Sequence, residues 1–539
     1  MMSKLLRVLP LLLMISIAFG GGMVENTNQS ADFVRMMARN ASTDLDAVFF
    51  NPAGLTKLDD GMHLYLSSQT ITQTRTITND IASLNSDTFE GTTFAPVFPN
   101  FYFAYKMDKL VVSAGFVPVG GGGTAAFEDG LPSFEAPASA LVPMMAAAGV
   151  TGYNLDVEFN GSSTYLGGQA SVSYAVNDMI SLSAGVRYFS ASNSYEGHLK
   201  DIKVETAAGD MIPGDVMRGV ASQYYDGAAL ATGAATSATG GATALQPLID
   251  GGAGGVSFAN LILGGQMAQA DVDAIAAGFT ALGVAGFDEA TWTPTIAQGA
   301  YTTAATEYAT QAAIATATGD GYTAQGLGLD AATADIEVDA VQTGSGFAPI
   351  LGLNISLMDK LNIGIRYEML APLVLTNETE VDGSGLFPDG AETNADMPAM
   401  LGVGLSYLAM PSLNIAFDYN MYFNEDANWD GDEAMTENGS ELAVGAEFAL
   451  SDALILSAGY NMATSGAMDS YQTDLSYSLN SSTIGLGAKY ALNDMMAVSL
   501  GFSTTSYEEG MNTAVDAGLG NETYMKTATI IAIGLTKSF

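Results

Sequence analysis

The sequence has no cysteine and only two histidines, His63 and His198, in 539 residues. Without cysteine there is no disulfide framework to hold a small secreted fold together. Basic residues are also scarce, with 17 lysines and arginines against 58 aspartates and glutamates and a formal net charge of −41. A chain without a basic patch cannot neutralise phosphates, so the composition argues against nucleic acid as a partner.

Long hydrophobic runs are missing after residue 20, where no apolar stretch reaches the roughly 18 residues of a membrane-spanning helix. Hydrophobic residues nevertheless make up 48% of the chain and charged residues only 14%, which is a low charge content for a soluble protein. A transmembrane β-barrel accounts for both facts, because its strands expose an apolar residue to lipid only at every second position.

The first twenty residues have the order of a secretory signal peptide. Lys4 and Arg7 precede an apolar stretch over 8–19, and Ala18-Phe19-Gly20 is a small-x-small cleavage signal. We expect cleavage after Gly20, which together with a barrel points to the outer membrane of a Gram-negative bacterium. An uncleaved anchor is the alternative.

Six short turns, most of them containing aspartate, separate alternating stretches of sequence. They lie at 105–110, 174–180, 355–361, 407–413, 448–454 and 490–496. Each turn joins two strands, which makes twelve, and a first and a last strand bring the count to fourteen. The predicted strands are 61–76, 94–105, 109–119, 162–176, 179–204, 341–357, 361–373, 396–409, 412–424, 440–450, 453–463, 474–491, 495–507 and 523–539.

Alternation within these stretches assigns a face to each residue. From Ile180, the residues Leu182, Val186 and Tyr188 point one way, and Ser181 and Arg187 point the other. A slip of one residue would place an arginine in lipid, at a cost of about 2–4 kcal/mol at mid-bilayer. A soluble β-sandwich could show the same alternation, but the leader and the terminal phenylalanine favour a barrel.

Ahead of the first strand stands Asp46-Ala-Val-Phe-Phe-Asn-Pro-Ala-Gly-Leu55, preceded by Asn26-Thr-Asn-Gln-Ser-Ala-Asp-Phe33. Over about 45 residues this region resembles the start of the FadL/TodX-type outer-membrane transporters, which carry long-chain fatty acids and other hydrophobic molecules. In that family an N-terminal hatch with an Asn-Pro-Ala motif plugs a 14-stranded barrel. Asn51, Pro52 and Ala53 match the motif, while a loop capping a β-domain is the plainer interpretation of the turn.

The resemblance implies the following domains: a signal peptide over 1–20, a hatch over 21–60 and an antiparallel 14-stranded transmembrane β-barrel over 61–539. It also implies a monomer surrounded by outer-membrane lipid and lipopolysaccharide, with a fatty acid or another hydrophobic small molecule as the transported ligand. The family has an inward kink in its third strand that opens the wall sideways. Pro118 and Gly120 are the candidates for that kink here, although the strand could simply end at Pro118.

Five residues are candidates for ligand contact. Arg187 and Arg366 both point inward, in matching Gly-x-Arg-Tyr contexts, and could bind a carboxylate. They could equally pair with Glu368 or with the hatch carboxylates Asp44 and Asp46, because buried arginines mostly pair with carboxylates. The remaining candidates are three hatch aromatics: Phe33, Phe49 and Phe50.

Two long loops are expected outside the membrane. Residues 120–161 form an apolar loop, and 205–340 form an insertion rich in Ala, Gly and Thr. Parts of the insertion could be helical, at 270–282 and 303–318, with Gly240-Gly241 and Gly251-Gly252 breaking the pattern. Low-complexity disorder is the alternative to a helical cap.

We expect no enzyme activity, catalytic residue, cofactor or metal site. The two histidines are predicted at opposite ends of the barrel, so they cannot share a Ser–His–acid site, and a lipid hydrolase is a weak alternative. Phosphate-loop, HExxH and EF-hand spacings are not seen. A porin-like or structural barrel is the stronger alternative to a passive transporter of hydrophobic molecules.

Overall fold

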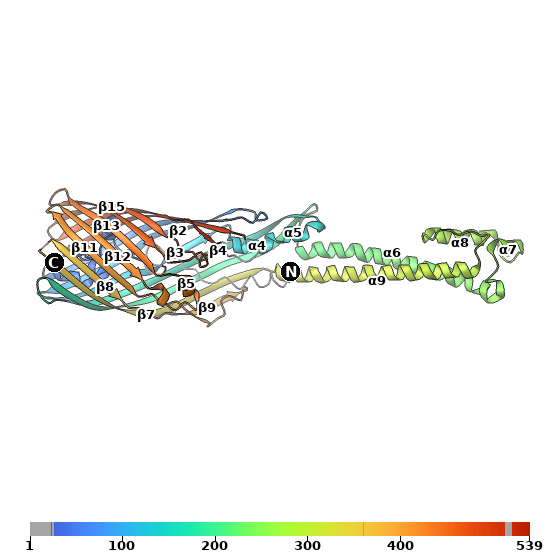
Figure 1. The fold of residues 1–539 in the computed structure, drawn as a ribbon, viewed down its shortest axis with the longest axis horizontal. Helices are drawn as coiled ribbons and strands as arrows, with labels where there is room; N and C mark the ends of the chain where they lie inside the picture. Colours follow the sequence, from blue (N-terminus) through green and yellow to red (C-terminus); the bar gives the residue numbers. More distant parts are fainter. Residues whose placement is uncertain (1–22, 24–25, 28, 359, 513–519) are drawn as a thin grey trace. The chain divides into compact units, whose positions relative to one another are not determined.

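The computed structural model describes residues 23, 26, 27, 29–358, 360–512 and 520–539 (Figure 1). The predicted signal peptide lies outside these residues. The chain divides into two compact units. The first holds the barrel and the hatch, and the second comprises 141–154 and 202–334.

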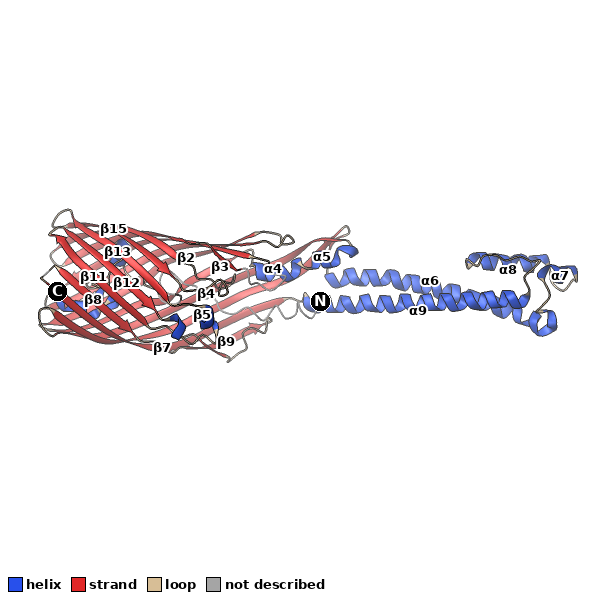
Figure 2. Ribbon diagram, viewed as in Figure 1, coloured by secondary structure: helices blue, strands red, loops and turns tan. Residues whose placement is uncertain are grey.

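The described residues of the first unit form a closed antiparallel barrel (Figure 2). Its strands are β1 (Gly61–Asn79), β2 (Thr88–Met107), β3 (Leu110–Phe127), β4 (Val150–Ala175), β5 (Ile180–Thr206), β7 (Ile336–Leu357), β8 (Leu361–Glu368), β9 (Val374–Asp382), β11 (Met400–Met410), β12 (Leu413–Tyr422), β13 (Gly439–Ala449), β14 (Leu454–Thr464), β15 (Ser481–Asn493), β16 (Met496–Tyr507) and β18 (Glu522–Ser538). β8 and β9 are two parts of one barrel strand, since both pair with β7. The described residues therefore contain fourteen barrel strands, which confirms the predicted number.

The last strand closes the barrel against the first. β18 pairs antiparallel with β1 from His63↔Ser538 to Asn79↔Glu522, and with β16 on its other side. Short strands extend the ladders at the loop ends, namely β6 (Gly209–Met211), β10 (Glu392–Asn394) and β17 (Gly510–Asn512).

Three predicted segments differ from the structure. β3 does not end at Pro118 but continues to Phe127, so the loop predicted over 120–161 is largely strand and helix. The predicted strand 361–373 is interrupted after Glu368, and the one predicted over 474–491 begins at Ser481. Alternation alone misplaced this last boundary, because Leu475, Tyr477 and Leu479 are buried in the bore without belonging to a strand.

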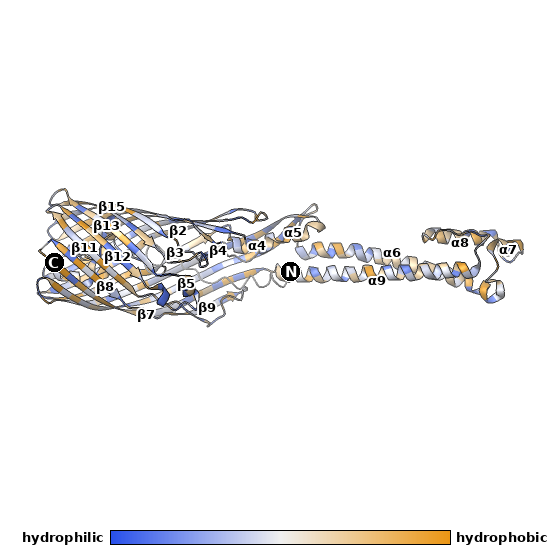
Figure 3. Cartoon of the chain, viewed as in Figure 1, coloured by the Kyte–Doolittle hydropathy of each residue, from blue (hydrophilic) through white to orange (hydrophobic). Residues whose placement is uncertain are grey.

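Alternation of polarity fixes the orientation of each strand (Figure 3). In β5 the outward Leu182, Val186 and Tyr188 are exposed, whereas the inward Ser181 and Arg187 are buried. Apolar side chains outside and polar ones inside are the pattern of a transmembrane barrel, which is the inverse of a soluble fold.

The hatch lies inside the barrel. It contains α2 (Ala31–Arg35), α3 (Ala47–Phe50) and the 3₁₀ helix η2 (Pro52–Lys57). Ser30 caps α2 by accepting a hydrogen bond from the Phe33 amide, and Asn51 caps η2. Nearly all of these residues are buried although the helices are short, so the barrel wall stabilises them rather than helix propensity.

Farther along the bore, away from the short turns, lies a second apolar cluster, which we call the distal cluster. It includes Phe89, Phe127, Leu131, Tyr477 and Tyr524. A short helix, α4 (Pro132–Ser139), joins it through Phe134, whose ring meets Phe159 edge-on with centroids 5.4 Å apart. Two further short 3₁₀ helices, η5 (Asn424–Asp426) and η6 (Asp432–Met435), lie between β12 and β13.

The second unit is mostly helical. Its helices are α5 (Leu141–Met145), η3 (Ala146–Ala148), α6 (Pro213–Leu248), η4 (Ile249–Ala253), α7 (Phe258–Leu263), α8 (Gln269–Ala281) and α9 (Pro294–Ala332). Two of its aromatic rings, Phe279 and Tyr301, stack with centroids 4.1 Å apart. The insertion is thus ordered as helices, which excludes the low-complexity alternative.

Of the two helix breaks predicted inside the insertion, the one at Gly240-Gly241 is wrong and the one at Gly251-Gly252 is confirmed. α6 runs through Gly240-Gly241 without a break. A Cβ at Gly241 would lie 2.7 Å from the Tyr301 ring, so the missing side chain lets α6 and α9 approach each other. At Gly252 the helix does break, with φ at +84°. Among the described residues, no helix combines the length and the apolarity that a membrane span requires.

Candidate functional site

The Asn-Pro-Ala motif is fixed to the barrel wall by hydrogen bonds. Asn51 accepts from the Ala53 amide at 3.3 Å and donates through Nδ2 to the Leu353 carbonyl at 3.0 Å. The Pro52 carbonyl accepts from the Ser173 hydroxyl at 2.7 Å. Each polar group of the turn therefore has a partner, and the motif joins η2 to β4 and β7.

Glycine in the wall makes room for this part of the hatch. A Cβ placed on Gly364 of β8 would lie 2.0 Å from the Asn40 carbonyl oxygen, and one on Gly352 of β7 would lie 2.5 Å from Asn51 Oδ1. The wall backbone therefore approaches the hatch backbone at Gly364 and the Asn51 side chain at Gly352.

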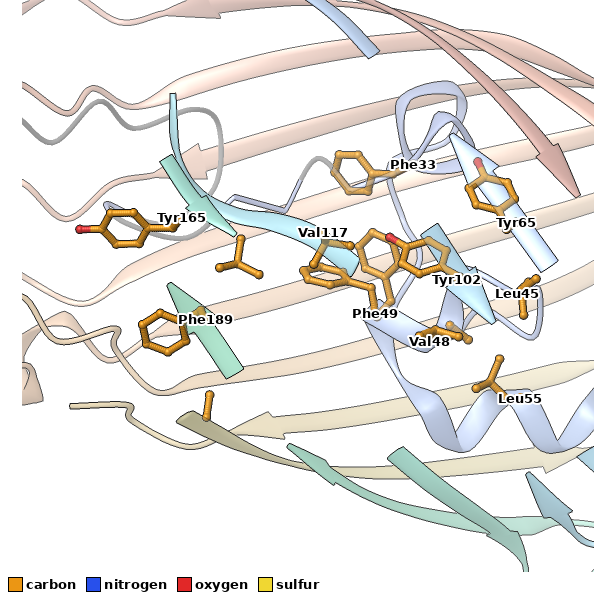
Figure 4. Packing of buried hydrophobic residues seen from close by; sticks show 14 of the residues in the cluster. Phe33, Leu45, Val48, Phe49, Leu55, Tyr65, Tyr102, Val117, Tyr165 and Phe189 are labelled. Atoms are coloured by element: carbon orange, nitrogen blue, oxygen red, sulfur yellow. The ribbon is translucent and has the colours of Figure 1, made fainter. Parts of the chain in front are cut away.

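The three hatch phenylalanines form one aromatic cluster, of which Phe33 and Phe49 are labelled in Figure 4. Phe33 and Phe50 stack with ring centroids 5.6 Å apart, and Phe49 meets Phe50 edge-on at 5.1 Å. Val117 of β3 belongs to the same apolar cluster. Of the three rings, Phe33 lines a small cavity beside the hatch, whereas Phe49 and Phe50 are buried, each with 4% of its surface exposed.

The two inward arginines hold the hatch. Both guanidinium groups lie on the Phe49 ring, with Cζ 4.7 Å from the centroid for Arg187 and 5.1 Å for Arg366. Arg187 also bonds Glu368 and Gln169, and Arg366 donates to the Phe49 carbonyl at 2.6 Å. Their partners are therefore a hatch aromatic, a hatch carbonyl and a wall carboxylate. Of the partners expected from the sequence, only Glu368 is among them.

The hatch carboxylates pair within the hatch and with a different strand. Asp46 accepts from Arg39 at 2.6 Å, and Asp44 accepts from Arg39 at 3.0 Å and lies 3.4 Å from Lys489 of β15. The positive charges of Lys489 and Arg39 lower the pKa of Asp44 below its usual range, so Asp44 is ionised at neutral pH.

Two more carboxylates tie the hatch to the wall. Asp418 of β12 accepts from the backbone amides of Arg39 and Asn40, at 2.5 and 2.7 Å. Arg35 of α2 pairs with Glu447 of β13 at 2.6 Å. Any displacement of the hatch has to break these charged contacts, which are among the stronger interactions in a buried setting.

The wall is not continuously hydrogen-bonded at the predicted kink. β2 and β3 pair up to Phe101↔Phe116 and then only at Thr92↔Ala126. Over the same region β3 stays paired with β4, with irregularities between Pro118 and Gly120 and between Gly121 and Gly123. We call the interval between β2 and β3, residues 93–100 and 117–125, the unpaired stretch.

Hatch residues supply hydrogen bonds where the strands do not. Gln29, which is fully buried, donates through Nε2 to the Pro118 carbonyl at 2.6 Å and accepts at Oε1 from Asn100 at 3.0 Å. Tyr102 donates to the Gln29 carbonyl at 2.6 Å, and the Asn26 amide donates to the Val119 carbonyl at 2.9 Å. Gln29 thus bridges β2 and β3 across the unpaired stretch.

A small cavity lies between the hatch and the β13–β18 side of the wall. Hatch residues Thr27, Phe33 and Met37 line it on one side, and Tyr507, Ala528 and Ile530 are among the wall residues on the other. Its wall combines apolar and hydroxyl-bearing side chains with Asn461 and the carboxylate of Glu441, and its volume of about 30 Å³ is far below the roughly 300–1,000 Å³ of typical ligand pockets.

The histidines have contacts unlike those of a hydrolase. His63 meets the Ser538 hydroxyl at 2.8 Å and the Asp59 backbone carbonyl at 2.9 Å, so its second nitrogen faces no carboxylate. His198 lies 3.3 Å from Asp156. Within the described ranges, no group of three or more His, Cys, Asp or Glu side chains could hold a metal ion.

Several residues of the site were not singled out from the sequence. Asp418 does alternate to the inner face of its strand, but alternation does not reveal that it accepts from the hatch backbone. Gln29 lies within the segment that carries the family resemblance, yet nothing in its type indicates a role. Its role depends on the distant Pro118 and Asn100, which only the fold brings together.

No family model and no curated protein matches the sequence. Among solved structures, a FadL homologue from Pseudomonas aeruginosa superposes with a TM-score of 0.57 at 12% identity, covering 96% of this chain and 100% of that chain. The toluene transporter TodX from Pseudomonas putida superposes with a TM-score of 0.51 at 13% identity, again covering 96% and 100%. The chain therefore has the FadL/TodX-type fold, as the resemblance at its N-terminus predicted.

Proposed function

We propose that this chain, which has the fold of a FadL homologue and of a toluene transporter, is a passive outer-membrane channel for hydrophobic molecules, with long-chain fatty acids as its main ligands. The observation that carries the proposal is the unpaired stretch between β2 and β3, bridged by Gln29 of the hatch. A wall with such an interval offers a sideways exit, and a structural barrel has no need of one.

The surroundings of the unpaired stretch suit an apolar passenger. Val117 and Val119 on β3 pack in the cluster of the hatch phenylalanines. Ala95 and Phe98 on β2 pack against a second cluster, which contains Ala31 and Val34 of the hatch. Phe94 and Val97 point outward and are each 66% exposed. The route is therefore apolar from the hatch to the outer surface of the wall.

In the mechanism we propose, a ligand enters the bore, reaches the cavity beside Phe33 and displaces the residues around Gln29. The molecule then leaves between β2 and β3 into the membrane. A ligand shifts the hatch only by binding the displaced state better than the closed one, so the passenger itself has to provide that difference. Asn51, Pro52 and Ala53 serve as the fixed end of the hatch, and the protein acts as a monomer.

Uptake of labelled oleate tests this function. The full-length protein is expressed in a Gram-negative strain that lacks its own fatty-acid channel, and uptake is compared with that of the empty strain. We expect uptake above the empty strain, and slower uptake in Asn51→Ala. Equal stimulation of oleate and sugar uptake would instead indicate a porin-like barrel.

A further inference from the structure

The loop between β14 and β15 folds back into the bore. Within it, residues 471–480 form neither helix nor strand, although Tyr477 is fully buried and Gln472, Leu475 and Leu479 each expose 8% or less of their surface. Connecting loops normally lie at the surface, where water satisfies their backbone. We call residues 471–480 the inserted loop, and its burial means that it occupies space a passenger in the bore would need.

The inserted loop reaches across the barrel. In the strand order of the closed sheet, with β8 and β9 counted as one strand, β4 and β5 stand half of the circumference away from β14 and β15. Phe159 of β4 and Tyr195 of β5 belong to the same distal cluster as Leu475, Tyr477 and Leu479. Apolar side chains therefore connect opposite walls, and the cluster spans the bore at this level.

The contacts between the inserted loop and the wall are mainly apolar. The Tyr477 ring stacks on Tyr524 of β18 with centroids 4.9 Å apart, and its hydroxyl donates to the Met525 carbonyl at 3.2 Å. Leu479 occupies the space beside Gly510 of β17, where a Cβ would lie 2.5 Å from Leu479 Cδ2. Another hydrocarbon surface can replace such contacts, whereas a polar solute cannot.

Several polar groups of the inserted loop are satisfied within the loop. Gln472 Nε2 donates to the Ser478 carbonyl, and Gln472 Oε1 accepts from the Ser478 amide, both at 2.9 Å. The Thr473 amide donates to the Ser476 carbonyl at 2.8 Å, and the Ser476 amide donates to the Thr473 carbonyl at 3.2 Å. Because these bonds stay inside the loop, the loop can move as one piece without leaving those groups unpaired.

Two hydrogen bonds join the inserted loop to its surroundings on other sides. Asp474 accepts from the Ser133 amide, at the start of α4, at 2.8 Å. Asn512 of β17 donates to the Gln472 carbonyl at 2.5 Å. Neither bond is an ion pair, unlike the contact between Arg35 and Glu447 that holds the hatch. The inserted loop is therefore attached less firmly than the hatch.

The inserted loop and the hatch follow each other along β18, which runs from the end of the barrel with the long loops to the end with the short turns. Tyr524, near the beginning of this strand, carries the ring of Tyr477. Ala528 and Ile530, farther along, line the small cavity that Phe33 of the hatch also lines. A passenger that enters from the long-loop end therefore meets the inserted loop before the hatch.

We propose that the inserted loop is a second gate, which an apolar passenger opens by replacing the contacts of Leu475, Tyr477 and Leu479 and which keeps polar solutes out of the bore. A passenger opens the gate only if it binds the open state better than the closed one, and hydrocarbon surface supplies that difference. The inference rests on the proposed function and adds to it a selection step ahead of the hatch.

Thiol labelling tests the closure directly, because the chain contains no cysteine and an introduced thiol is unique. Full-length protein carrying Ala528→Cys, on the inner face of β18 behind the inserted loop, is placed in lipid nanodiscs and treated with a sulfonated maleimide. We expect slow labelling. The rate should rise about tenfold or more when Tyr477→Ala is added, since removal of a buried aromatic side chain favours the open state.

Two tyrosine substitutions in the Ala528→Cys background are the controls. Tyr477→Phe keeps the ring that stacks on Tyr524 and should label close to the parent rate. Tyr490→Ala removes an outward tyrosine of β15, 51% exposed, and should leave the rate unchanged. The gel mobility of the unheated protein shows whether each variant retains its barrel. Equal labelling with and without Tyr477→Ala would overturn the gate, as would an equal rise in Tyr490→Ala.

A reversible crosslink tests whether a passenger needs the loop to move. Leu479→Cys combined with Gly510→Cys ties the loop to the wall, and the first substitution removes the side chain that a Cβ on Gly510 would meet. Cells expressing the oxidised double variant should take up oleate about fivefold or more slowly than after reduction, because the gate is held closed. Each single variant, treated identically, should transport like wild type. Thiols that fail to join would contradict the contact between Leu479 and Gly510 on which the closure depends.

Failure of the gate differs from failure of the proposed function. If wild type and the reduced double variant take up no oleate beyond the empty strain, the proposed function fails, and the opening by an apolar passenger fails with it. If both take up oleate but the crosslink does not slow them, or Tyr477→Ala does not change the labelling, only the gate is refuted.

Discussion

The guanidinium carbon of Arg187, on the barrel wall, lies 4.7 Å from the centroid of the Phe49 ring of the hatch. Arg366 approaches the same ring from a neighbouring part of the wall. Two cations from the wall thus hold one aromatic side chain of the hatch. Phe49 is therefore one of the residues that tie the hatch to the barrel, beside the charged contacts of Asp418 and Glu447.

Replacing Phe49 should loosen the hatch. Phe49→Ala removes a buried aromatic side chain, a change that typically costs about 3–5 kcal/mol. Phe49→Leu keeps most of the apolar volume but removes the aromatic ring. Its smaller loss of stability therefore measures the cation–π contribution, roughly 2 kcal/mol when desolvated. Melting temperature and protease cleavage between residues 40 and 60 provide the measurements. A Phe49→Leu variant that melts and resists protease like wild type would show that the arginines do not act through the ring.

Gln29→Ala should open the sideways route. The substitution leaves the Pro118 carbonyl and the Asn100 amide without their hatch partner, at a cost of roughly 1–3 kcal/mol for the closed arrangement. We therefore expect faster oleate uptake by cells that express this variant. Gln246→Ala, on exposed α6, is the control and should behave like wild type. Unchanged or slower uptake in Gln29→Ala would show that this residue does not keep the route closed.

Substitutions at two glycines of β3 allow the costs of backbone strain and of steric overlap to be measured separately. Gly121 and Gly123 have nearly the same positive φ, +77° and +76°. A Cβ on Gly121 would lie 2.4 Å from the Ser163 carbonyl oxygen, whereas one on Gly123 meets nothing closer than 3.8 Å. Gly123→Ala should cost about 1–3 kcal/mol through strain alone, and Gly121→Ala should cost more. Denaturant unfolding of both variants measures the difference, and equal costs would refute the close approach of β3 to β4.

Acid should weaken the ion pair between Lys489 of the wall and Asp44 of the hatch. The pKa of Asp44 is lowered in the folded protein, chiefly by Lys489, so its stabilising effect is complete above the unfolded pKa of about 3.9. The effect is lost as the pH falls through the lower, folded pKa. The melting temperatures of wild type and Asp44→Asn should therefore differ most at neutral pH and converge in acid. Asp178→Asn, an exposed turn residue, should show no such convergence. A difference that grows in acid would contradict the assignment.

The insertion offers a matched pair of adjacent glycines. Gly241→Leu should disturb the packing of α6 on α9, since its side chain would meet the Tyr301 ring, at about 1–3 kcal/mol for an overpacked contact. Gly240→Leu, with nothing within 4 Å of its Cβ, should leave the helices unchanged or stabilise them. Helical circular dichroism during melting distinguishes the two, and identical curves would refute the contact between α6 and Tyr301.

Local patterns in the sequence were enough to predict the barrel but not the contacts inside it. Alternation identified Arg187 and Arg366 as inward residues, because the two faces of a strand meet opposite environments. The same reasoning could not show that both would meet Phe49, since that contact joins residues more than a hundred positions apart. The strand breaks at 369–373 and at Ser481 were missed for a related reason. There the segment turns into the bore, so its apolar residues are buried by tertiary packing instead of facing lipid.

The continuation of β3 beyond Pro118 illustrates a different limit. A proline that is followed, after Val119, by four glycines suggests a strand end, because proline donates no ladder hydrogen bond. The strand persists because β4 pairs with it through two irregularities and because Gln29 and Asn26 bind the carbonyls of Pro118 and Val119. In the insertion, threonines at positions such as Thr239 and Thr306 donate to the carbonyl four residues earlier. Such bonds satisfy the hydroxyl groups but do not favour a helix by themselves, so the close packing of α6 on α9, as at Gly241 and Tyr301, stabilises these long helices.

The ladder between β1 and β18 has a consequence for how the molecule is assembled. Its two strands are the first and last of the barrel, so the cylinder cannot be completed until the final residues up to Ser538 have been synthesised. A chain cut short before β18 would leave β1 and β16 as open edges, with backbone groups that nothing satisfies in lipid. Biogenesis therefore has to deliver the polypeptide as far as β18 to the membrane before the two ends of the sheet can meet.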